Sequence, residues 1–205
     1  PDKPTASQGQ ILRLSGAQAG DPAGVSRMAY DGTVLPISAD EWKAPAVTTR
    51  DIDRGDAPHF LLKEISEAPH SFRKTLRGRL IEEQGRYHVR LPAETLPPAL
   101  RTRLSGIRRV EVIGQGTAAV AGQAVAAAIG EALTGAEVVV RAITATELSG
   151  FHLHDDMAST LVVAISQSGT TTDTNRTVDL ARSRGAAVVA IVNRRGSDLV
   201  DKADG

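Results

Sequence analysis

Cysteine is absent from this 205-residue sequence, and aromatic residues make up only 3% of it. Without cysteine there is no disulfide framework, no cysteine metal site and no thiol nucleophile. Hydrophobic residues nevertheless reach 41%, so the core must be built mainly from Ala, Val, Ile and Leu. The length suits one ordinary domain with a tail, or two small domains.

Net charge and long apolar runs are also lacking. The sequence has 24 Lys and Arg against 24 Asp and Glu, a formal net charge of zero. A neutral chain of this kind favours neither nucleic acid nor an anionic membrane as a partner. No apolar run approaches bilayer-spanning length and no signal peptide pattern opens the chain, so we expect a cytoplasmic protein. Position 1 is Pro rather than Met, which is consistent with a fragment or a processed product.

The most informative stretch runs from Thr160 to Thr174. Leu161 to Ile165 is apolar throughout, the pattern of a parallel strand that is buried on both faces. Residues 166–172 carry a hydroxyl or an amide at every position except Gly169, and helical spacing follows from Asp173. Backbone N–H groups and the positive end of the helix dipole would point into this loop. The pattern therefore indicates an anion site, for phosphate above all.

Turn chemistry offers an alternative to a bound ligand. Serine and threonine are good N-caps, so a polar strand-to-helix turn needs no anion. One capping hydroxyl would suffice, yet five hydroxyls crowd this loop, and this density favours the anion site. Neither a Walker motif nor Gly-x-Gly-x-x-Gly is present in the loop. We expect no nucleotide here and no other cofactor.

The second half of the chain alternates predicted strands and helices. Strands are expected at 110–114, 137–143, 161–165 and 186–192, and helical segments at 119–133, 144–151, 172–184 and 196–202. This alternation predicts an α/β fold, a doubly wound parallel sheet flanked by helices. The first and third strands should be neighbours, with the loops 115–118 and 166–171 meeting at the carboxyl edge of the sheet.

The first half of the chain predicts an irregular N-terminal segment followed by helices. Gln10 to Ser15 has weak strand character, and Met28 to Ile37 predicts a hairpin that turns at Asp31-Gly32. Residues 38–58 are polar and aperiodic, as in a connector. Helical spacing runs from 59 to 79, where Pro69 predicts two short helices rather than one. An extended piece at 80–89 and a short helical element at 92–104 complete this half.

Two stretches raise the question of a metal. Asp51, Asp53 and Asp56 depart from the EF-hand order and lack the bidentate Glu that ends such a loop, which favours a solvated linker. His152 to Asp156 holds two histidines and two aspartates, but no distant residue completes a ligand set. A surface loop is favoured there, so we predict no metal site.

Several motifs together resemble the SIS (sugar isomerase) domain, and within it the isomerase half of the glutamine–fructose-6-phosphate aminotransferases. The specific signal is Ser166-Gln167-Ser168-Gly169-x-Thr171-x-Asp173-Thr174, and similar flanking pieces lie at Pro58 to Pro69, Thr75 to Arg79 and Asn193 to Val200. On this resemblance, residues 1–57 are the tail of a glutaminase-like region with its linker. Residues 58–106 are a helical lead-in, and residues 107–205 are an SIS domain, incomplete at its C-terminus.

The resemblance also implies which residues touch the ligand. The phosphate of a sugar would be held by the loop that contains Ser166, Gln167, Ser168, Gly169 and Thr171, and Gly116 and Thr117 would border the sugar. Two positions depart from the family pattern. Gln115-Gly116-Thr117-Ala118 replaces the family's usual Cys-Gly-Thr-Ser, so Ala118 lacks a hydroxyl, and Thr170 stands where Glu is commonest. These departures leave the exact phosphosugar open.

By resemblance, the chain is the sugar-phosphate-binding part of an enzyme that makes glucosamine 6-phosphate from fructose 6-phosphate and glutamine for amino-sugar synthesis. The full-length protein would be a homodimer. The family's glutaminase cysteine is absent, and its catalytic Lys, Glu and His belong to regions beyond residue 205. We therefore expect no catalytic residue here and no activity from this chain alone.

Other functions of the same fold remain open. A phosphosugar deglycase is compatible with Ala118 and Thr170, whereas the lead-in at 58–79 argues against a simple aldose–ketose isomerase. A non-catalytic sugar-phosphate sensor attached to a DNA-binding module is disfavoured, because the sequence has no basic recognition helix. The expected partner is a phosphorylated sugar, fructose 6-phosphate or glucosamine 6-phosphate, with neither nucleic acid nor membrane.

Overall fold

The computed structural model describes residues 9–42 and 53–205. The chain divides into two compact units, Pro1–Pro45 and Ala46–Gly205. In the first unit, β1 (Ile11–Leu14) pairs with β2 (Val25–Met28), and β2 pairs with β3 (Val34–Leu35), all antiparallel. Short 3-10 turns η2 (Gly16–Gln18), η3 (Pro22–Gly24) and η4 (Ala39–Glu41) lie between and after the strands. The irregular N-terminal segment thus contains a small sheet.

The hairpin turn predicted at Asp31-Gly32 is confirmed. Gly32 has a φ of 87°, in the left-handed region that glycine adopts without strain. The N–H of Thr33 donates to the Asp31 carboxylate at 2.9 Å, and this bond lowers the pKa of Asp31 below its ordinary value. The residue types of Asp31 and Gly32 therefore determine the turn that connects β2 and β3.

Glu41 ties the end of this unit back to β2. Its carboxylate accepts a hydrogen bond from Arg27 Nη1 at 2.6 Å, and from the backbone N–H and the hydroxyl of Ser38 at 2.9 Å each. These donors, Arg27 first, lower the pKa of Glu41 from 4.5 to about 2. A carboxyl whose pKa is lower in the folded state stabilises the fold above its unfolded pKa. The contribution is lost as pH falls from 4.5 toward 2.

We expect Glu41→Gln to remove this part of the acid sensitivity. Urea unfolding of this unit can be followed by the fluorescence of Trp42, the one tryptophan of the chain. Between neutral pH and pH 3, the wild type should lose more stability than Glu41→Gln, because the variant has no carboxylate left to protonate. The neighbouring Asp40→Asn should behave like the wild type. Equal pH dependence in the wild type and Glu41→Gln would contradict the assignment.

The second unit begins with a single helix, α2 (Phe60–Leu76), so the prediction of two short helices was wrong. Pro69 lies inside this helix. Its missing N–H removes one backbone hydrogen bond, to Ile65, while helical spacing continues on both sides. The helix is capped at its start by His59, whose Nδ1 accepts from Leu62 N at 3.2 Å. A proline inside an otherwise helical pattern was therefore too weak a signal to end the helix.

The remaining lead-in follows the prediction. The extended piece is a hairpin of β4 (Leu80–Glu83) and β5 (Arg86–Val89). Gln84 and Gly85 between them both have positive φ, 53° and 74°, as the tight turns of two-residue hairpins require. The turn η5 (Ala93–Thr95) and helix α3 (Pro98–Leu104) follow. The short helical element expected at 92–104 is thereby confirmed.

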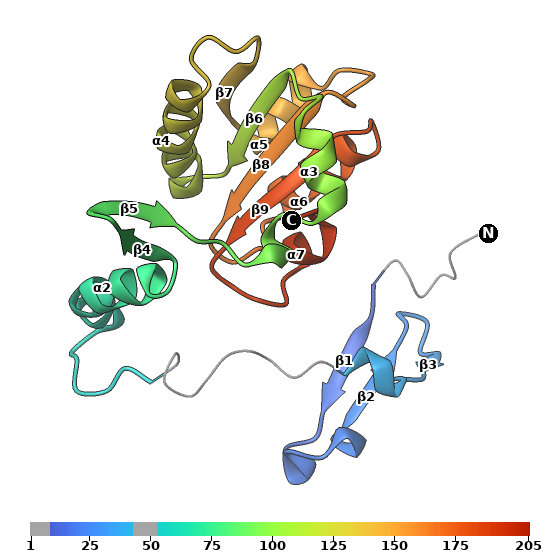
Figure 1. The fold of residues 1–205 in the computed structure, drawn as a ribbon. Coiled ribbons are helices and arrows are strands. Elements are labelled where there is room, and N and C mark those ends of the chain that lie inside the picture. The colour runs from blue at the N-terminus through green and yellow to red at the C-terminus, as the bar shows by residue number, and fades with distance from the viewer. Residues whose placement is uncertain (1–8, 43–52) are drawn as a thin grey trace. The chain divides into compact units, whose positions relative to one another are not determined.

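A four-stranded parallel sheet forms the rest of the unit (Figure 1). Its strands are β6 (Arg109–Gly114), β7 (Val139–Thr144), β8 (Thr160–Ser166) and β9 (Ala187–Val192), in the order β7-β6-β8-β9. The doubly wound α/β prediction is confirmed, and so is the prediction that the first and third strands of this sheet are neighbours. In their register, Ile113 lies opposite Ala164.

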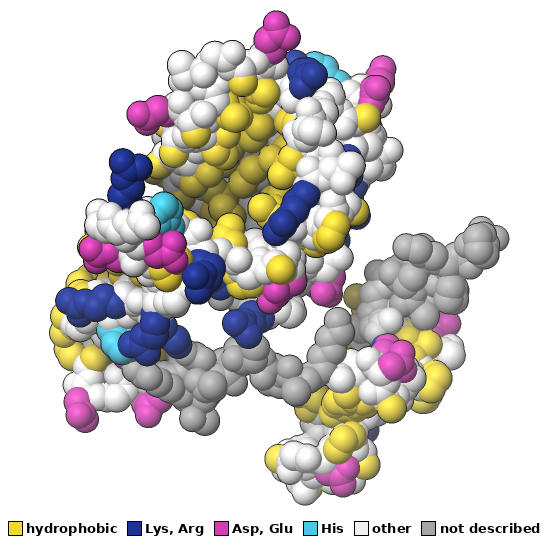
Figure 2. All heavy atoms as spheres, viewed as in Figure 1, with side chains coloured by type: hydrophobic (Ala, Val, Ile, Leu, Met, Phe, Trp, Pro, Cys, Tyr) yellow, Lys and Arg dark blue, Asp and Glu magenta, His cyan; other side chains and the backbone are white. Residues whose placement is uncertain are grey.

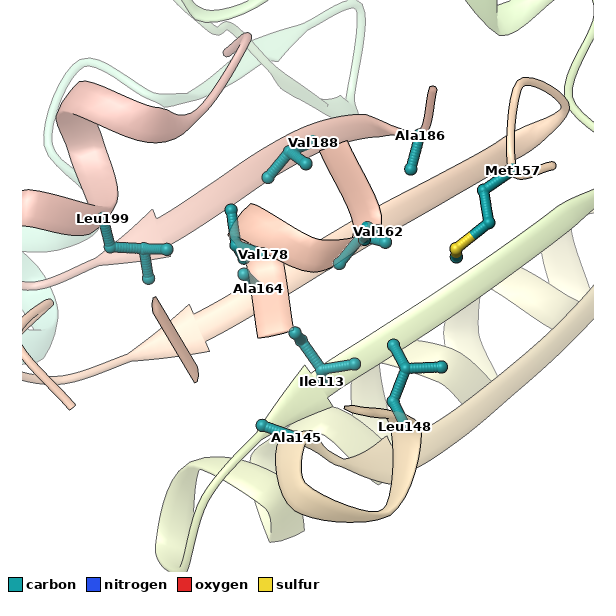
Figure 3. Packing of buried hydrophobic residues seen from close by; sticks show 11 residues of the cluster. Ile113, Ala145, Leu148, Met157, Val162, Ala164, Val178, Ala186, Val188 and Leu199 are labelled. Carbon is teal, nitrogen blue, oxygen red and sulfur yellow. The ribbon is translucent and has the colours of Figure 1, made fainter. Parts of the chain in front are cut away.

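Helices cover both faces of this sheet. One face packs against the turns α5 (Ala145–Glu147) and η6 (Leu148–His152) and the helices α6 (Thr172–Arg182) and α7 (Asp198–Lys202). Val178 of α6 and Val162, Ala164 and Val188 of the sheet belong to the core of this face (Figure 3). Burying a side chain of this size stabilises the fold by about 1.5–3 kcal/mol, so this side anchors the domain.

The opposite face is covered mainly by α4 (Thr117–Ala132), which begins two residues earlier than expected. Gly122 lets this helix approach closely, since a Cβ there would lie 3.4 Å from Val112 Cγ1 and 4.0 Å from Ile165 Cδ1. Beyond α4, hydrophobic side chains line a hollow over the sheet (Figure 2). Ile191 of β9, on this face, is 48% exposed. Among the described residues, no helix is long and apolar enough to cross a membrane.

Candidate functional site

The strand order creates a switch point between β6 and β8. From β6 the chain moves to β7 at the sheet edge, and it then returns past β6 to form β8 and β9. In open α/β sheets, ligands bind outside the carboxyl ends of the strands at such a point. Gln115 to Thr117 follow β6 there, and Gln167 to Thr171 follow β8. The structure thus brings together the two loops that the sequence singled out.

Gly169 is the fixed point of the loop after β8. Its φ is 69°, and it is buried. Its N–H donates to Ser166 Oγ at 3.0 Å, and its carbonyl accepts from Asn175 Nδ2 at 3.0 Å and from Leu199 N at 3.1 Å. Strand β8, helix α6 and helix α7 therefore all hold this one residue. These contacts fix the geometry of the loop, as a preorganised binding site requires.

The hydroxyl oxygens of Ser166 and Ser168 accept hydrogen bonds from within the loop. Ser166 Oγ accepts from Gly169 N, while Ser168 Oγ accepts from Thr170 N at 3.2 Å and from Thr170 Oγ1 at 3.1 Å. Since a hydroxyl combines one donor with two acceptor lone pairs, accepting bonds does not use its proton. These bonds therefore leave the protons of Ser166 and Ser168 for another acceptor. Gln167 is exposed and Thr171 half-buried.

Two helix N-termini point into this edge without side-chain caps. The N-cap of α6 is Thr171 and that of α4 is Gly116, and neither makes a side-chain capping hydrogen bond. The hydroxyl of Thr171 therefore does not cap α6, as the alternative interpretation of the hydroxyl-rich loop would require. Backbone N–H groups in the first turns of helices of 11 and 16 residues stay without a capping side chain. At the start of α4, however, Ala118 N and Ala119 N already donate to the backbone carbonyls of Gln115 and Gly116, at 3.2 and 3.0 Å. The start of α6, with its positive dipole end, therefore suits an anion better than the start of α4.

Glycines shape the loop after β6. A Cβ on Gly114 would come within 2.7–2.9 Å of the backbone of Ala118 and Ala119, so the start of α4 folds tightly over the strand end. Gly116 has φ 58° and ψ −129°, a conformation essentially confined to glycine, and nothing lies near its Cβ position. Gly116 and Thr117 are both exposed. They leave open space at the border where the sugar is expected.

Sequence reasoning missed Asn175 as a supporting residue. Its Nδ2 donates to the carbonyls of Gly169 and Thr171 at 3.0 and 3.1 Å, and the residue is 7% exposed. One side chain thus holds two carbonyls of the loop. The only signal in the sequence is an amide in the first turn after a polar loop, which predicts no particular partner. The contact depends on how α6 folds back over the loop.

Ser197 was noted only as part of a flanking motif, and the structure places it against Gly169. A Cβ on Gly169 would overlap Ser197 Oγ and lie 2.5 Å from Ser197 Cβ. Ser197 is 4% exposed, and its Oγ has no hydrogen-bond partner among the described residues. The turn after β9 is therefore packed directly on the loop after β8.

The stretches considered for a metal lie elsewhere. His152 ends η6, and residues 153–159 lead into the amino end of β8, opposite the loop after that strand. Asp51 lies outside the described residues. Within the described parts of the chain, no group of three or more His, Cys, Asp or Glu is placed to hold a metal ion.

Comparison with known proteins adds a family to this geometry. The glutamine–fructose-6-phosphate aminotransferase (isomerizing) of Symbiobacterium thermophilum is 34% identical over 197 residues, covering 88% of this chain and 29% of that protein. The same enzyme of Corynebacterium glutamicum is 38% identical over 167 residues, covering 80% and 24%. The chain thus spans less than a third of the length of these curated relatives.

Fold comparison agrees. The solved C-terminal domain of glucosamine-fructose-6-phosphate aminotransferase from Francisella tularensis matches with a TM-score of 0.58 and 22% identity, over 74% of this chain and 39% of that one. At this identity the match concerns the fold. The family model of the SIS domain matches residues 103–205, half of the sequence. With its parallel sheet, switch point and hydroxyl-rich loop, the chain belongs to the SIS domain family.

Proposed function

We propose that this chain is the sugar-phosphate-binding portion of an isomerising glutamine–fructose-6-phosphate aminotransferase. The enzyme would be cytoplasmic and homodimeric at full length, and would make glucosamine 6-phosphate. Residues 1–57 would be the end of a glutaminase region with its linker, 58–106 the lead-in and 107–205 the sugar-phosphate domain. The names of the curated relatives and the motif around Ser166 support this proposal.

The observation that carries the proposal is the loop after β8. In this loop, the hydroxyl oxygens of Ser166 and Ser168 accept hydrogen bonds from backbone N–H groups. The loop lies at the switch point of the sheet, beside the N-terminus of α6, which has no side-chain cap. In our proposal, Ser166, Gln167, Ser168, Gly169 and Thr171 bind the phosphate of fructose 6-phosphate or glucosamine 6-phosphate. Gly116 and Thr117 border the sugar. Hydroxyl and backbone N–H donors suit three phosphate oxygens because they supply several directed hydrogen bonds at once.

A phosphosugar deglycase or isomerase of the same fold is the second candidate. Ala118 and Thr170 are compatible with a deglycase, since both differ from the residues usual in aminotransferases, whereas the lead-in at 58–79 argues against a simple isomerase. The two candidates separate in a titration of the chain with fructose 6-phosphate, glucosamine 6-phosphate and amine-conjugated fructose 6-phosphates. Preference for the conjugates by tenfold or more, about 1.4 kcal/mol, would favour the deglycase.

The Ser168→Asp variant tests the phosphate site. Wild-type chain with fructose 6-phosphate at 100 times its Kd should gain about 2.7 kcal/mol, a rise of roughly 5–10 °C in Tm for a chain of this size. The new carboxylate stands where the phosphate should bind, so like charges repel and Ser168→Asp should show no rise. Nonphosphorylated fructose should have little effect on either protein.

The matched control is Ser159→Asp. Ser159 is exposed and precedes the same strand at its opposite end. This variant should keep the full rise in Tm with fructose 6-phosphate. Equal rises in Ser168→Asp and the wild type would refute the proposed phosphate site.

We further expect binding without turnover from this chain. Moving a proton between sugar carbons needs a positioned base within hydrogen-bond reach. The two loops offer hydroxyls, amides and backbone N–H groups, and the carboxylate nearest in sequence, Asp173, is exposed in the first turn of α6. Binding of the phosphate lowers the free energy of the bound sugar but does not lower the activation barrier of the isomerisation.

Accordingly, the purified chain should form no glucosamine 6-phosphate and should not interconvert fructose 6-phosphate and glucose 6-phosphate, even with ammonia supplied. Coupled enzymatic assays of both products measure this. Detecting either reaction, and losing it in Thr171→Val, would show that the catalytic residues lie in this domain after all.

A further inference from the structure

The proposed phosphate loop has no basic side chain, whereas the turn after β9 has two. Residues 166–172 contain hydroxyls, an amide and Gly169, while Arg194 and Arg195 lie between Asn193 and Gly196. A phosphomonoester carries about −1.5 to −2 charges near neutral pH. Neutral donors and helix dipoles offset only part of this charge. Cations from another element would offset more of this charge.

The turn after β9 is attached to the phosphate loop at both of its ends. A Cβ on Gly169 would lie 2.9 Å from Val192 Cγ1, before the turn, and would overlap Ser197 Oγ, after it. Leu199 N also donates to the Gly169 carbonyl at 3.1 Å. Only four residues, 193–196, span the distance between these two anchors. Neither arginine is more than two residues from a side chain that touches the loop.

Both arginines are exposed, and neither takes part in an ion pair among the described residues. By contrast, Arg141 and Arg182 are paired with carboxylates. An unpaired guanidinium offers a planar set of donors that matches phosphate oxygens. The two cations at this edge are thus available for an anionic ligand.

Nearby carboxylates make the arginines more important. Asp173 lies in the first turn of α6, and Asp198 and Asp201 lie in the first turn of α7. Without Arg194 and Arg195, these two helix starts would carry only negative side chains, which would repel a phosphoryl group. Both arginines together offset two of these three formal negative charges.

We propose that Arg194 and Arg195 are further phosphate-binding residues that supply the positive charge of the site. They would contact the phosphoryl oxygens from the turn after β9, while the hydroxyls contact them from the loop after β8. The ligand class is a phosphomonoester, and the inference rests on the proposed function. The turn after β9 then forms the second wall of the site, and Gly169 joins it to the first.

The test is a titration of the whole chain with fructose 6-phosphate by calorimetry at low and high salt. The variant is R194Q/R195Q, and the control is R77Q/R86Q, which removes two exposed arginines from the lead-in. At low salt, R194Q/R195Q should bind about tenfold more weakly. The gap should narrow at high salt, because salt screens exposed charges. The control should stay within about twofold of the wild type, and all three should unfold at similar temperatures.

A pH series adds a readout that a structural role would not move. The second pKa of a phosphomonoester is about 6, so affinity should rise with pH through 6 more steeply in the wild type than in R194Q/R195Q. Equal affinity and equal salt dependence in the two proteins would overturn the role of the arginines and leave the proposed function standing. Absence of binding by the wild type would instead overturn the proposed function, and this inference with it.

Discussion

Gly169→Ala is expected to destabilise the second unit by about 2–6 kcal/mol and to abolish phosphate binding. Two independent effects add. The φ of 69° is one that non-glycine residues adopt at a cost of about 1–3 kcal/mol. The new methyl would also overlap Ser197 Oγ and approach Val192 Cγ1 to 2.9 Å, and overpacking of this kind costs about 1–3 kcal/mol.

The measurement is urea unfolding followed by far-UV circular dichroism, because all the α-helices of the described residues lie in the second unit. Thermal shift with fructose 6-phosphate reports binding. Gly130→Ala is the control: Gly130 lies inside α4 with nothing within 4 Å of its Cβ position. That change should be neutral or stabilising by up to about 1 kcal/mol, since alanine favours the helix more than glycine does.

A double variant separates the two causes. Gly169→Ala combined with Ser197→Gly removes the overlap with Ser197 but leaves the backbone strain and the close approach to Val192 Cγ1. Stability should recover in part, by about 1–2 kcal/mol, and the interaction energy of the pair should be clearly nonzero. If Gly169→Ala alone leaves stability and binding unchanged, the loop is not held as we describe.

Glu111→Ala is expected to cost about 2–3 kcal/mol. The Glu111 side chain is fully buried in the central strand β6, where Oε2 accepts from Arg141 Nε at 2.6 Å and Oε1 lies 3.7 Å from Arg109 Nη1. Breaking a buried ion pair typically costs 3–5 kcal/mol. We expect less here because both arginines are about one-third exposed, at 33% and 32%, and can turn to water.

The residue that replaces Glu111 determines how much stability is lost. Glu111→Leu keeps most of the volume and removes a carboxylate whose desolvation is unfavourable, so it should cost less than Glu111→Ala, within about 1 kcal/mol of the wild type. Glu131→Ala, on the exposed side of α4, should stay within about 0.5 kcal/mol. The same unfolding experiment by circular dichroism measures all three. A loss in Glu111→Ala no larger than in Glu131→Ala would mean that the ion pair contributes nothing.

Local patterns in the sequence determined most of the elements of the second half. The apolar run at Leu161 to Ile165 became β8, and Gly185, with φ 91°, follows the end of α6 where the prediction stopped that helix. The alternation of strands and helices was enough for the doubly wound sheet. These predictions succeeded because burial on both faces and turn chemistry act on residues that are close together in the chain.

The candidate site was only partly legible in the sequence. The hydroxyl-rich residues Ser166 to Thr171 were found from their composition, and their neighbourhood with Gln115 to Thr117 followed from the expected strand order. Pro69 misled in the lead-in, because a strong helical pattern on both sides outweighs the loss of one backbone hydrogen bond. A residue's local preference decides an element only where its neighbours do not oppose it.

Only the tertiary structure decided what holds the loop and what surrounds it. Asn175 binds two loop carbonyls, Ser197 packs on Gly169, and Thr171 leaves the N-terminus of α6 without a side-chain cap. No pattern in the sequence predicts these features, because each depends on how the helices pack on the sheet. The sequence alone therefore determined which residues reach the carboxyl edge. Packing decided which of them hold the loop and which remain free to bind a ligand.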